Sequence, residues 1–142
     1  MATVTADLTT GFRVELRNDR HVWHADEPVA DGGSDTAPTP YEQLLGAVGA
    51  CTCITVSLYA QRKGIALTSI SAQFHYEKVH ADDCADCGDG REGWLDHVRA
   101  EIFLEGTFTD DQRKRLVEVA QRCPVRRTLE NGIVFTERVV AG

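Results

Sequence analysis

The feature that most constrains this chain is the uncharged run of nineteen residues at positions 43–61. Its length approaches that of a membrane span, but five polar side chains dilute it and the sequence has no second such run. Thr39 suits an N-cap, Pro40 suits the first helical position, and Gly64 suits the end of a helix. We therefore expect a buried central helix from Pro40 to Lys63 and no membrane span.

The remaining patterns predict an α+β fold in a single domain over residues 1–142. Alternating apolar residues indicate strands, and the spacing of Thr109 and Gln112 is that of a capping box. In chain order we expect a meander of strands over residues 1–27, a loop over 28–40, paired strands over 69–79 and 98–104, a helix from about 109 to 122 that Cys123-Pro124 interrupts, a short helix to Glu130, and a last strand from Ile133 to Val140.

The net charge and the N-terminal residues bear on the partners and the location of the protein. The 142 residues carry 15 Lys plus Arg against 22 Asp plus Glu, a net charge of −7. A surface of this sign repels phosphate backbones, so we expect no nucleic-acid partner. The first residues contain neither a basic stretch nor an apolar run of the signal-peptide kind, which predicts a cytoplasmic protein.

Five cysteines are too few for a disulfide scaffold, and an odd number cannot all pair within one chain. They are therefore candidates for catalysis, metal binding or simple burial. Cys123 precedes a helix-opening proline, where free amide groups and the helix dipole favour a thiolate. Cys51 lies within the long helix and would need a cation from elsewhere, for which Arg20, Arg126 and Arg127 are candidates. At about 100° per residue, Cys53 points roughly 200° away from Cys51.

The segment 39–51, Thr-Pro-Tyr-Glu-Gln-Leu-Leu-Gly-Ala-Val-Gly-Ala-Cys, and the segment 122–129, Arg-Cys-Pro-Val-Arg-Arg-Thr-Leu, together resemble the signature of the OsmC/Ohr family of hydroperoxide-reducing proteins. The resemblance extends from about Pro38 to Val140. It implies antiparallel strands wrapped around two long helices in an intertwined homodimer, with active sites at the subunit interface. Small residues in the middle of the first helix agree with close packing there.

By this resemblance Cys51 corresponds to the peroxidatic cysteine and Cys123 to the resolving one. The implied function is a thiol-dependent peroxidase that acts on organic hydroperoxides or hydrogen peroxide in oxidative or osmotic stress. A Cys51 sulfenic acid would condense with Cys123 to a disulfide, which a dithiol reductant such as a lipoylated protein reopens. The cycle requires no cofactor.

The family's peroxidatic cysteine is polarised by a glutamate that follows the proline and by an arginine from the N-terminal region. The glutamate position is Tyr41 here, and Glu42 falls on the side of the helix opposite Cys51. Arg20 is our candidate for the arginine. The pattern is therefore closer to the OsmC-like branch than to the organic hydroperoxidases.

A second group of candidate residues is His80, Cys84 and Cys87, in an acidic segment between two expected strands. They offer three ligands for zinc or another soft metal, with His75 or a residue of a partner chain as a fourth. The alternatives are a redox pair and two loop cysteines without a role. The rival to the enzyme is accordingly a non-catalytic protein of the same fold that binds an apolar ligand or zinc.

Overall fold

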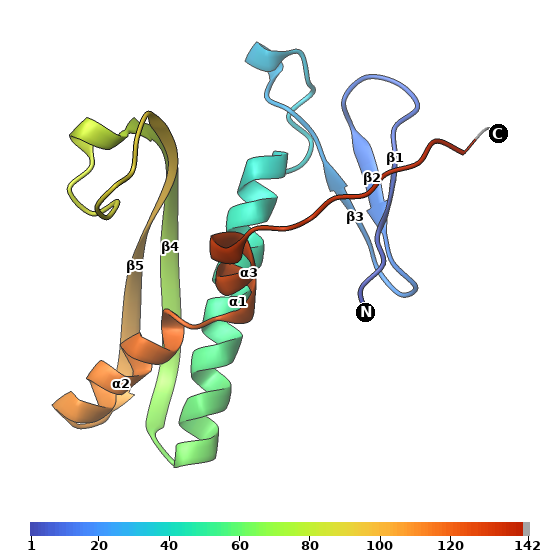
Figure 1. Cartoon of the computed structure of the whole chain (residues 1–142). Helices are drawn as coiled ribbons and strands as arrows, with labels where there is room; N and C mark the ends of the chain where they lie inside the picture. Colours follow the sequence, from blue (N-terminus) through green and yellow to red (C-terminus); the bar gives the residue numbers. More distant parts are fainter. Residues whose placement is uncertain (141–142) are drawn as a thin grey trace. The chain divides into compact units, whose positions relative to one another are not determined.

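Three α-helices and two antiparallel sheets make up most of the regular structure of residues 1–140, the part of the chain that the computed structural model describes (Figure 1). The α+β class expected from the sequence is confirmed. The elements in chain order are β1 (Thr5–Asp7), β2 (Val14–Arg17), β3 (Val22–Ala25), the 3₁₀ turn η1 (Val29–Asp31), α1 (Pro40–Lys63), β4 (Ala66–His80), the 3₁₀ turn η2 (Ala81–Asp83), β5 (Trp94–Thr107), α2 (Asp110–Ala120) and α3 (Pro124–Asn131).

The chain forms two compact units, residues 1–46 and the part that begins at Ala47, and each is described by itself. The expectation of a single domain over residues 1–142 stays a prediction. In the first unit β1, β2 and β3 form the expected antiparallel meander, in that order. The Asn18 side chain fixes the turn between β2 and β3, because its Oδ1 accepts hydrogen bonds from the backbone N–H groups of Arg20 and His21 at 2.9 and 2.7 Å.

Asp26 holds together the loop that leads to α1. The residue is 1% exposed, and its carboxylate accepts hydrogen bonds from the backbone N–H of Glu27, Ser34 and Thr36 and from the Thr36 hydroxyl, the last at 2.6 Å. The Thr36 hydroxyl, helped by the backbone donors, lowers the pKa of Asp26 from 3.8 to about 2. Gly33 packs so closely that a Cβ there would lie 2.0 Å from the Glu27 carbonyl oxygen.

We expect the Asp26 network to make the stability of the protein depend on pH. The folded-state pKa is depressed, so the stabilisation is present above about pH 4 and is lost as the pH falls towards 2. Asp26→Asn should remove this contribution, because an amide cannot accept all four hydrogen bonds. Urea unfolding from pH 2 to 7 measures the effect: the difference between wild type and Asp26→Asn should shrink as the pH falls, whereas the exposed Asp31→Asn should follow wild type. Parallel curves for wild type and Asp26→Asn would contradict the prediction.

Helix α1 begins and ends where the sequence predicts. Thr39 and Glu42 cap its start reciprocally: the Glu42 N–H donates to Thr39 Oγ1 at 3.2 Å, and the Thr39 N–H donates to Glu42 Oε1 at 2.9 Å. These hydrogen bonds also lower the pKa of Glu42. Gly64, with a φ of +66°, ends the helix in the left-handed conformation that glycine adopts readily.

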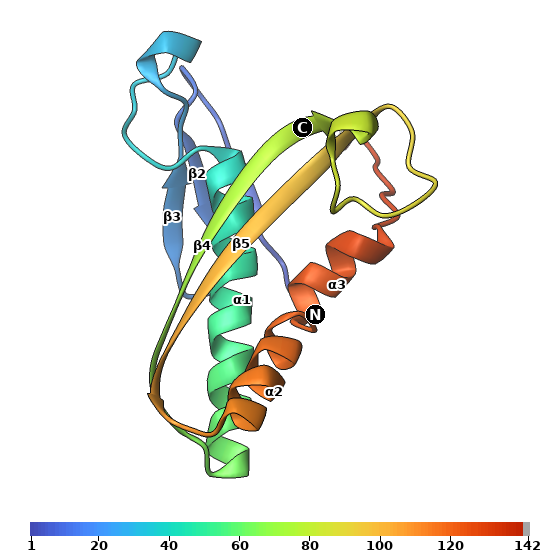
Figure 2. The ribbon, with the colours of Figure 1, turned by 90° about the vertical axis from the view of Figure 1, so that its left-hand side faces the viewer.

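In the second unit α1 and α2 pack on the long hairpin of β4 and β5 (Figure 2). The register pairs Ile70 with Leu104 and Ala72 with Ile102, which confirms the expected hairpin and extends it at both ends. The ring of Phe74 lies 3.3 Å from where a Cβ of Gly49 would be, so one of the small residues of α1 permits close contact with β4. The core consists of Val56, Ala60, Leu116, Val119 and Ala120, with partly buried neighbours on β4 and β5.

One sequence expectation is wrong. Residues 133–140 are exposed and form no strand, because a strand needs a hydrogen-bonded neighbour and none of the described residues pairs with this segment. In the single chain helix α1 buries Val48, Thr52, Val56 and Ala60, one residue every four, and the burial of its other faces stays a prediction. By length and composition α1 could cross a membrane, with a mean hydropathy of 1.5 over 18 residues of which 22% are buried, but core helices of soluble proteins pass the same test.

Candidate functional site

Cys51 lies on α1 beside the buried stripe, and its side chain is half-buried. Its Sγ is 3.9 Å from the hydroxyl of Thr55, one helical turn further on. Successive residues of a helix differ by about 100°, which aligns Cys51 with the exposed Leu44, Ile54 and Leu58 to within about 60°. Cys51 therefore lies next to a solvent-facing apolar surface of the single chain.

Cys123 occupies the break between α2 and α3 that the sequence predicts. It is the N-cap of α3, Pro124 is the first helical residue, and the Cys123 sulfur accepts a hydrogen bond from the backbone N–H of Arg126 at 3.4 Å. The residue is fully buried. Helix α2 ends at Ala120, two residues before the expected end, because the chain turns there to bring Cys123 to the start of α3.

Cys123 lies against the turn of α1 that carries Cys51. The Cys123 sulfur lies 3.5 Å from the Thr52 hydroxyl, and Thr52 directly follows Cys51. Thr52 is itself 3% exposed, so the contact is shielded from water. The fold thus brings Cys123 into contact with a residue 71 positions earlier in the sequence, whereas the pairing of the Cys51 and Cys123 sulfurs in a disulfide stays a prediction. Cys53, about 200° around the helix from Cys51, is half-buried.

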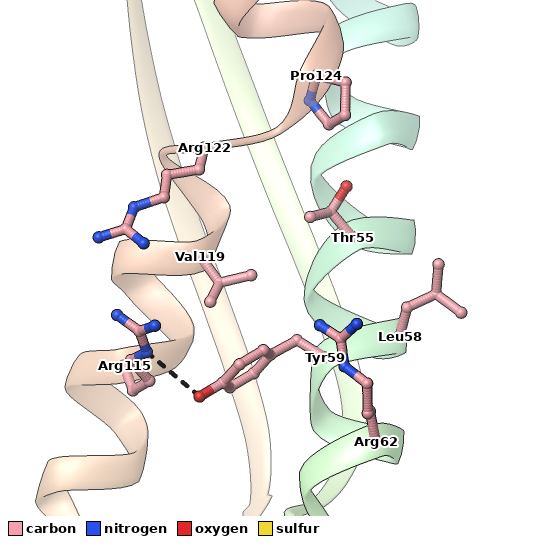
Figure 3. Close-up of a pocket in the computed structure, with 8 residues that line it drawn as sticks. All are labelled: Thr55, Leu58, Tyr59, Arg62, Arg115, Val119, Arg122 and Pro124. Carbon is pink, nitrogen blue, oxygen red and sulfur yellow. Dashed lines mark hydrogen bonds between the residues drawn. The ribbon is translucent and has the colours of Figure 1, made fainter.

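A groove of about 440 Å³ opens one turn beyond Cys51, between α1 and α2 (Figure 3). Its walls carry the arginines Arg62, Arg115 and Arg122. It also reaches Thr55, which contacts Cys51, and Pro124, which follows Cys123 in the sequence. Arg115 donates from Nε to the Tyr59 hydroxyl at 3.2 Å, which raises the pKa of Arg115, and it also pairs with Glu118. These charges favour an anionic group in the groove.

Of these arginines, Arg62 and Arg122 form no ion pair with a residue that the structure describes. Sequence reasoning missed them, although two signals were available. Arg122 directly precedes Cys123, and Arg62 follows Cys51 by eleven residues, a spacing that returns to nearly the same face of a helix.

The three cations named from the sequence come from two parts of the chain. Arg126 pairs with Glu130 at 3.6 Å, and Arg127 is exposed on α3. Arg20 lies in the turn between β2 and β3, in the first unit, whereas Cys51 belongs to the second. The role of Arg20 as the partner of Cys51 stays a prediction.

The second group of candidates lies in the loop between β4 and β5. Cys84 and Cys87 are joined by a disulfide, with Cα atoms 5.5 Å apart. A ring nitrogen of His97 and the two sulfurs all lie within 4.8 Å of one another, and all three residues are half-buried. His80 is not in this cluster: its Nδ1 accepts a hydrogen bond from the Asp82 N–H at 3.2 Å, and its ring packs edge-on against Trp94. The structure therefore groups the cysteine pair with His97 in place of His80.

Comparisons with known proteins agree with this fold. A family profile described as OsmC-like protein matches residues 32–138, whereas no curated protein matches the chain in sequence. The crystal structure of an OsmC-like protein from Mycoplasma pneumoniae aligns with a TM-score of 0.70 at 20% identity, over 90% of this chain and 86% of that one. Two organic hydroperoxide resistance proteins also align, from Legionella pneumophila (TM-score 0.62, 17% identity, 88% of this chain and 85% of that one) and Elizabethkingia anophelis (0.58, 19%, 89% and 87%).

Proposed function

The chain belongs to the OsmC-like protein family, and we propose that it is a thiol-dependent peroxidase in which Cys51 is the peroxidatic and Cys123 the resolving cysteine. The substrates would be organic hydroperoxides or hydrogen peroxide. The observation that carries the proposal is the contact between the Cys123 sulfur and Thr52, the residue after Cys51. Structural relatives named as organic hydroperoxide resistance proteins add to it.

The proposed reaction uses only the two thiols, the peroxide and a reductant. The Cys51 thiolate attacks one peroxide oxygen, the O–O bond breaks, and the leaving alkoxide takes up a proton to give an alcohol. Cys51 is then a sulfenic acid. The Cys123 sulfur attacks the Cys51 sulfur, water leaves, and a disulfide forms. A dithiol, such as that of a lipoylated protein, returns both cysteines to thiols and is itself oxidised to a disulfide.

The environments of the two cysteines suit these separate roles. Cys51 is half-buried and contacts Thr55, which lines the arginine-bearing groove, so a peroxide could reach it and the groove could hold the rest of the substrate. Cys123 is fully buried, which protects it from direct oxidation until the sulfenic acid has formed at Cys51. A disulfide requires the two Cα atoms to be about 4.4–6.8 Å apart, so the start of α3 and the Cys51 turn must reach that separation in the oxidised enzyme.

We also propose that the protein acts as a homodimer. Helix α1 carries an outer stripe of exposed residues, at spacings of three and four, that comprises Ala47, Ala50, Ile54, Leu58 and Gln61. Ile54 and Leu58 are each 59% exposed in the single chain. Small residues followed by large apolar ones at this spacing are suited to packing against a second helix. Since Cys51 borders the outer stripe, a partner seated there would help to enclose the site.

The second candidate function is ligand binding without catalysis. The groove favours it, because a volume of about 440 Å³ lies within the usual range for small-molecule sites. On this view the groove holds a small molecule with an apolar body and an anionic group, and the cysteines at positions 51 and 123 are inert towards peroxide.

A map of disulfides separates the two functions. The reduced protein is treated with one equivalent of an organic hydroperoxide, blocked with a thiol reagent, digested and analysed by mass spectrometry. We expect a Cys51–Cys123 link in wild type, and a Cys51 sulfenic acid that a dimedone-type reagent traps in Cys123→Ser. Cys53 should stay a free thiol and acts as the internal control. If Cys51 and Cys123 both remain free thiols, the enzyme proposal is wrong.

A further inference from the structure

We propose that Cys84, Cys87 and His97 form a zinc site when the two cysteines are reduced, and that the disulfide and the bound metal are mutually exclusive states of this loop. The proposal concerns residues that the peroxidase cycle does not use. It therefore stands or falls independently of the proposed function.

The distances between the three side chains are close to those of a zinc site. In a tetrahedral site with Zn–S of about 2.3 Å and Zn–N of about 2.0 Å, ligand atoms lie roughly 3.3–3.8 Å from one another. The two sulfurs and the His97 nitrogen already lie within 4.8 Å. Reduction of the disulfide would let the sulfurs separate to the required distance through side-chain rotation, because two residues between two cysteines is the usual spacing in zinc knuckles. The fourth position would be open to water.

The backbone around the loop holds these residues in place. Strand β5 lies antiparallel to β4 with His97 opposite Glu77, so His97 projects from a regular hairpin. The Ala81 N–H donates to the Gly93 carbonyl at 2.8 Å and closes the base of the loop, and the Cys84 N–H donates to the Ala81 carbonyl at 3.3 Å. Two of the three ligands are thus fixed to ordered backbone before any metal binds, which lowers the entropic cost of binding.

The charges near the cluster favour a cation. Glu77 Oε1 lies 4.0 Å from His97 Nδ1, so a carboxylate lies beside the histidine of the cluster. Arg99 Nε holds the same Glu77 oxygen at 3.5 Å. The loop between β4 and β5 also contains five acidic residues and one arginine, namely Asp82, Asp83, Asp86, Asp89, Glu92 and Arg91.

Oxidation to a disulfide and zinc binding both use the sulfur lone pairs of Cys84 and Cys87, so the two states exclude each other. Zinc binds thiolates, so each thiol must lose its proton when the metal enters. A two-electron oxidant of the diamide class removes two electrons from the pair, one S–S bond forms, the oxidant takes up two protons, and the metal loses two anionic ligands. The loop would therefore release zinc when it is oxidised.

Cobalt(II) is the probe for the test, because its thiolate complexes absorb light where the protein does not. The full-length protein is reduced with a phosphine, desalted without oxygen and titrated with cobalt(II), and zinc is then added as a competitor. We expect one cobalt per chain, a thiolate-to-cobalt charge-transfer band, and displacement by zinc. Cys84→Ser and Cys87→Ser should lose the band, and His97→Gln should weaken binding by about tenfold or more.

The matched control is His80→Gln, which removes the histidine nearer in sequence to the cysteine pair and should bind cobalt like wild type. Cys51→Ser/Cys123→Ser should also bind one cobalt, because it retains the cluster and lacks the other cysteine pair. Far-UV circular dichroism checks that each variant is folded. Diamide treatment should abolish the band, and the phosphine should restore it.

Three results would overturn the proposal: reduced wild type without the charge-transfer band, a band that survives in Cys84→Ser, or binding that is lost in His80→Gln and retained in His97→Gln. Equal cobalt affinity in the diamide-treated protein would overturn the claim of mutual exclusion. None of these results bears on the Cys51–Cys123 link, which the disulfide map tests separately.

Discussion

Cys51→Ser is expected to lower peroxide turnover by at least about a thousandfold, to the rate of the reductant alone. A serine hydroxyl is not ionised near neutral pH and cannot take the place of the thiolate that attacks the O–O bond. The measurement is steady-state consumption of an organic hydroperoxide with dihydrolipoamide as the dithiol. Cys123→Ser should retain a single turnover, because the sulfenic acid still forms at Cys51.

Helix α1 provides its own control for this experiment. Cys53 is two residues away, is half-buried like Cys51 and faces about 200° away from it, so Cys53→Ser should keep the wild-type rate. Wild-type turnover in Cys51→Ser would refute the enzyme and favour the ligand-binding alternative. An equal loss in both serine variants, with both still folded by circular dichroism, would contradict the assignment of Cys51 as the one reactive cysteine of α1.

The second large effect is expected at the outer stripe of α1. Ile54→Asp should raise the dissociation constant of the homodimer by about a hundredfold or more, equivalent to roughly 2.7 kcal/mol, since it places a charge where the partner helix would bury an apolar side chain. In the single chain Ile54 is 59% exposed, so the fold of the monomer should survive. Sedimentation over a range of concentrations measures the shift.

Ile54→Leu is the matched control for the dimer. It keeps the apolar character and volume of the side chain and should leave the dissociation constant within a few-fold of wild type. The proposed dimer is wrong if wild type sediments as a monomer at all concentrations, or if Ile54→Asp and Ile54→Leu dissociate alike.

Local signals predicted the elements that depend on local chemistry. Thr39, Pro40 and Gly64 fixed both ends of α1, and the Cys123-Pro124 pair fixed the break between α2 and α3. The β4–β5 hairpin followed from alternation of apolar residues on one face. The strand expected over residues 133–140 was wrong because alternation predicts only that a segment suits a sheet, whereas pairing requires a neighbour.

The candidate site was less predictable because it depends on tertiary contacts. His97 lies ten residues after Cys87, and only the register of β4 and β5 brings it back to the loop, where it is grouped with the cysteine pair instead of His80. The groove also depends on tertiary contacts, since Arg62 and Arg115 come from two helices whose packing cannot be deduced from local sequence patterns. Resemblance to the family directed attention to Cys51 and Cys123, but no spacing rule would have selected them from five cysteines.

The β4–β5 hairpin has a consequence for the newly made chain. Among the residues that the structure describes, this ribbon has two strands, so the outer edges of β4 and β5, about fifteen residues each, have no strand partner. Exposed edges of this kind pair with strands of other chains and promote aggregation until a native partner covers them. Charged side chains along the ribbon, Lys78 and Arg99 among them, slow that pairing. Rapid assembly of the proposed homodimer after synthesis would therefore protect the protein against aggregation, in addition to the stability that its hydrophobic core provides.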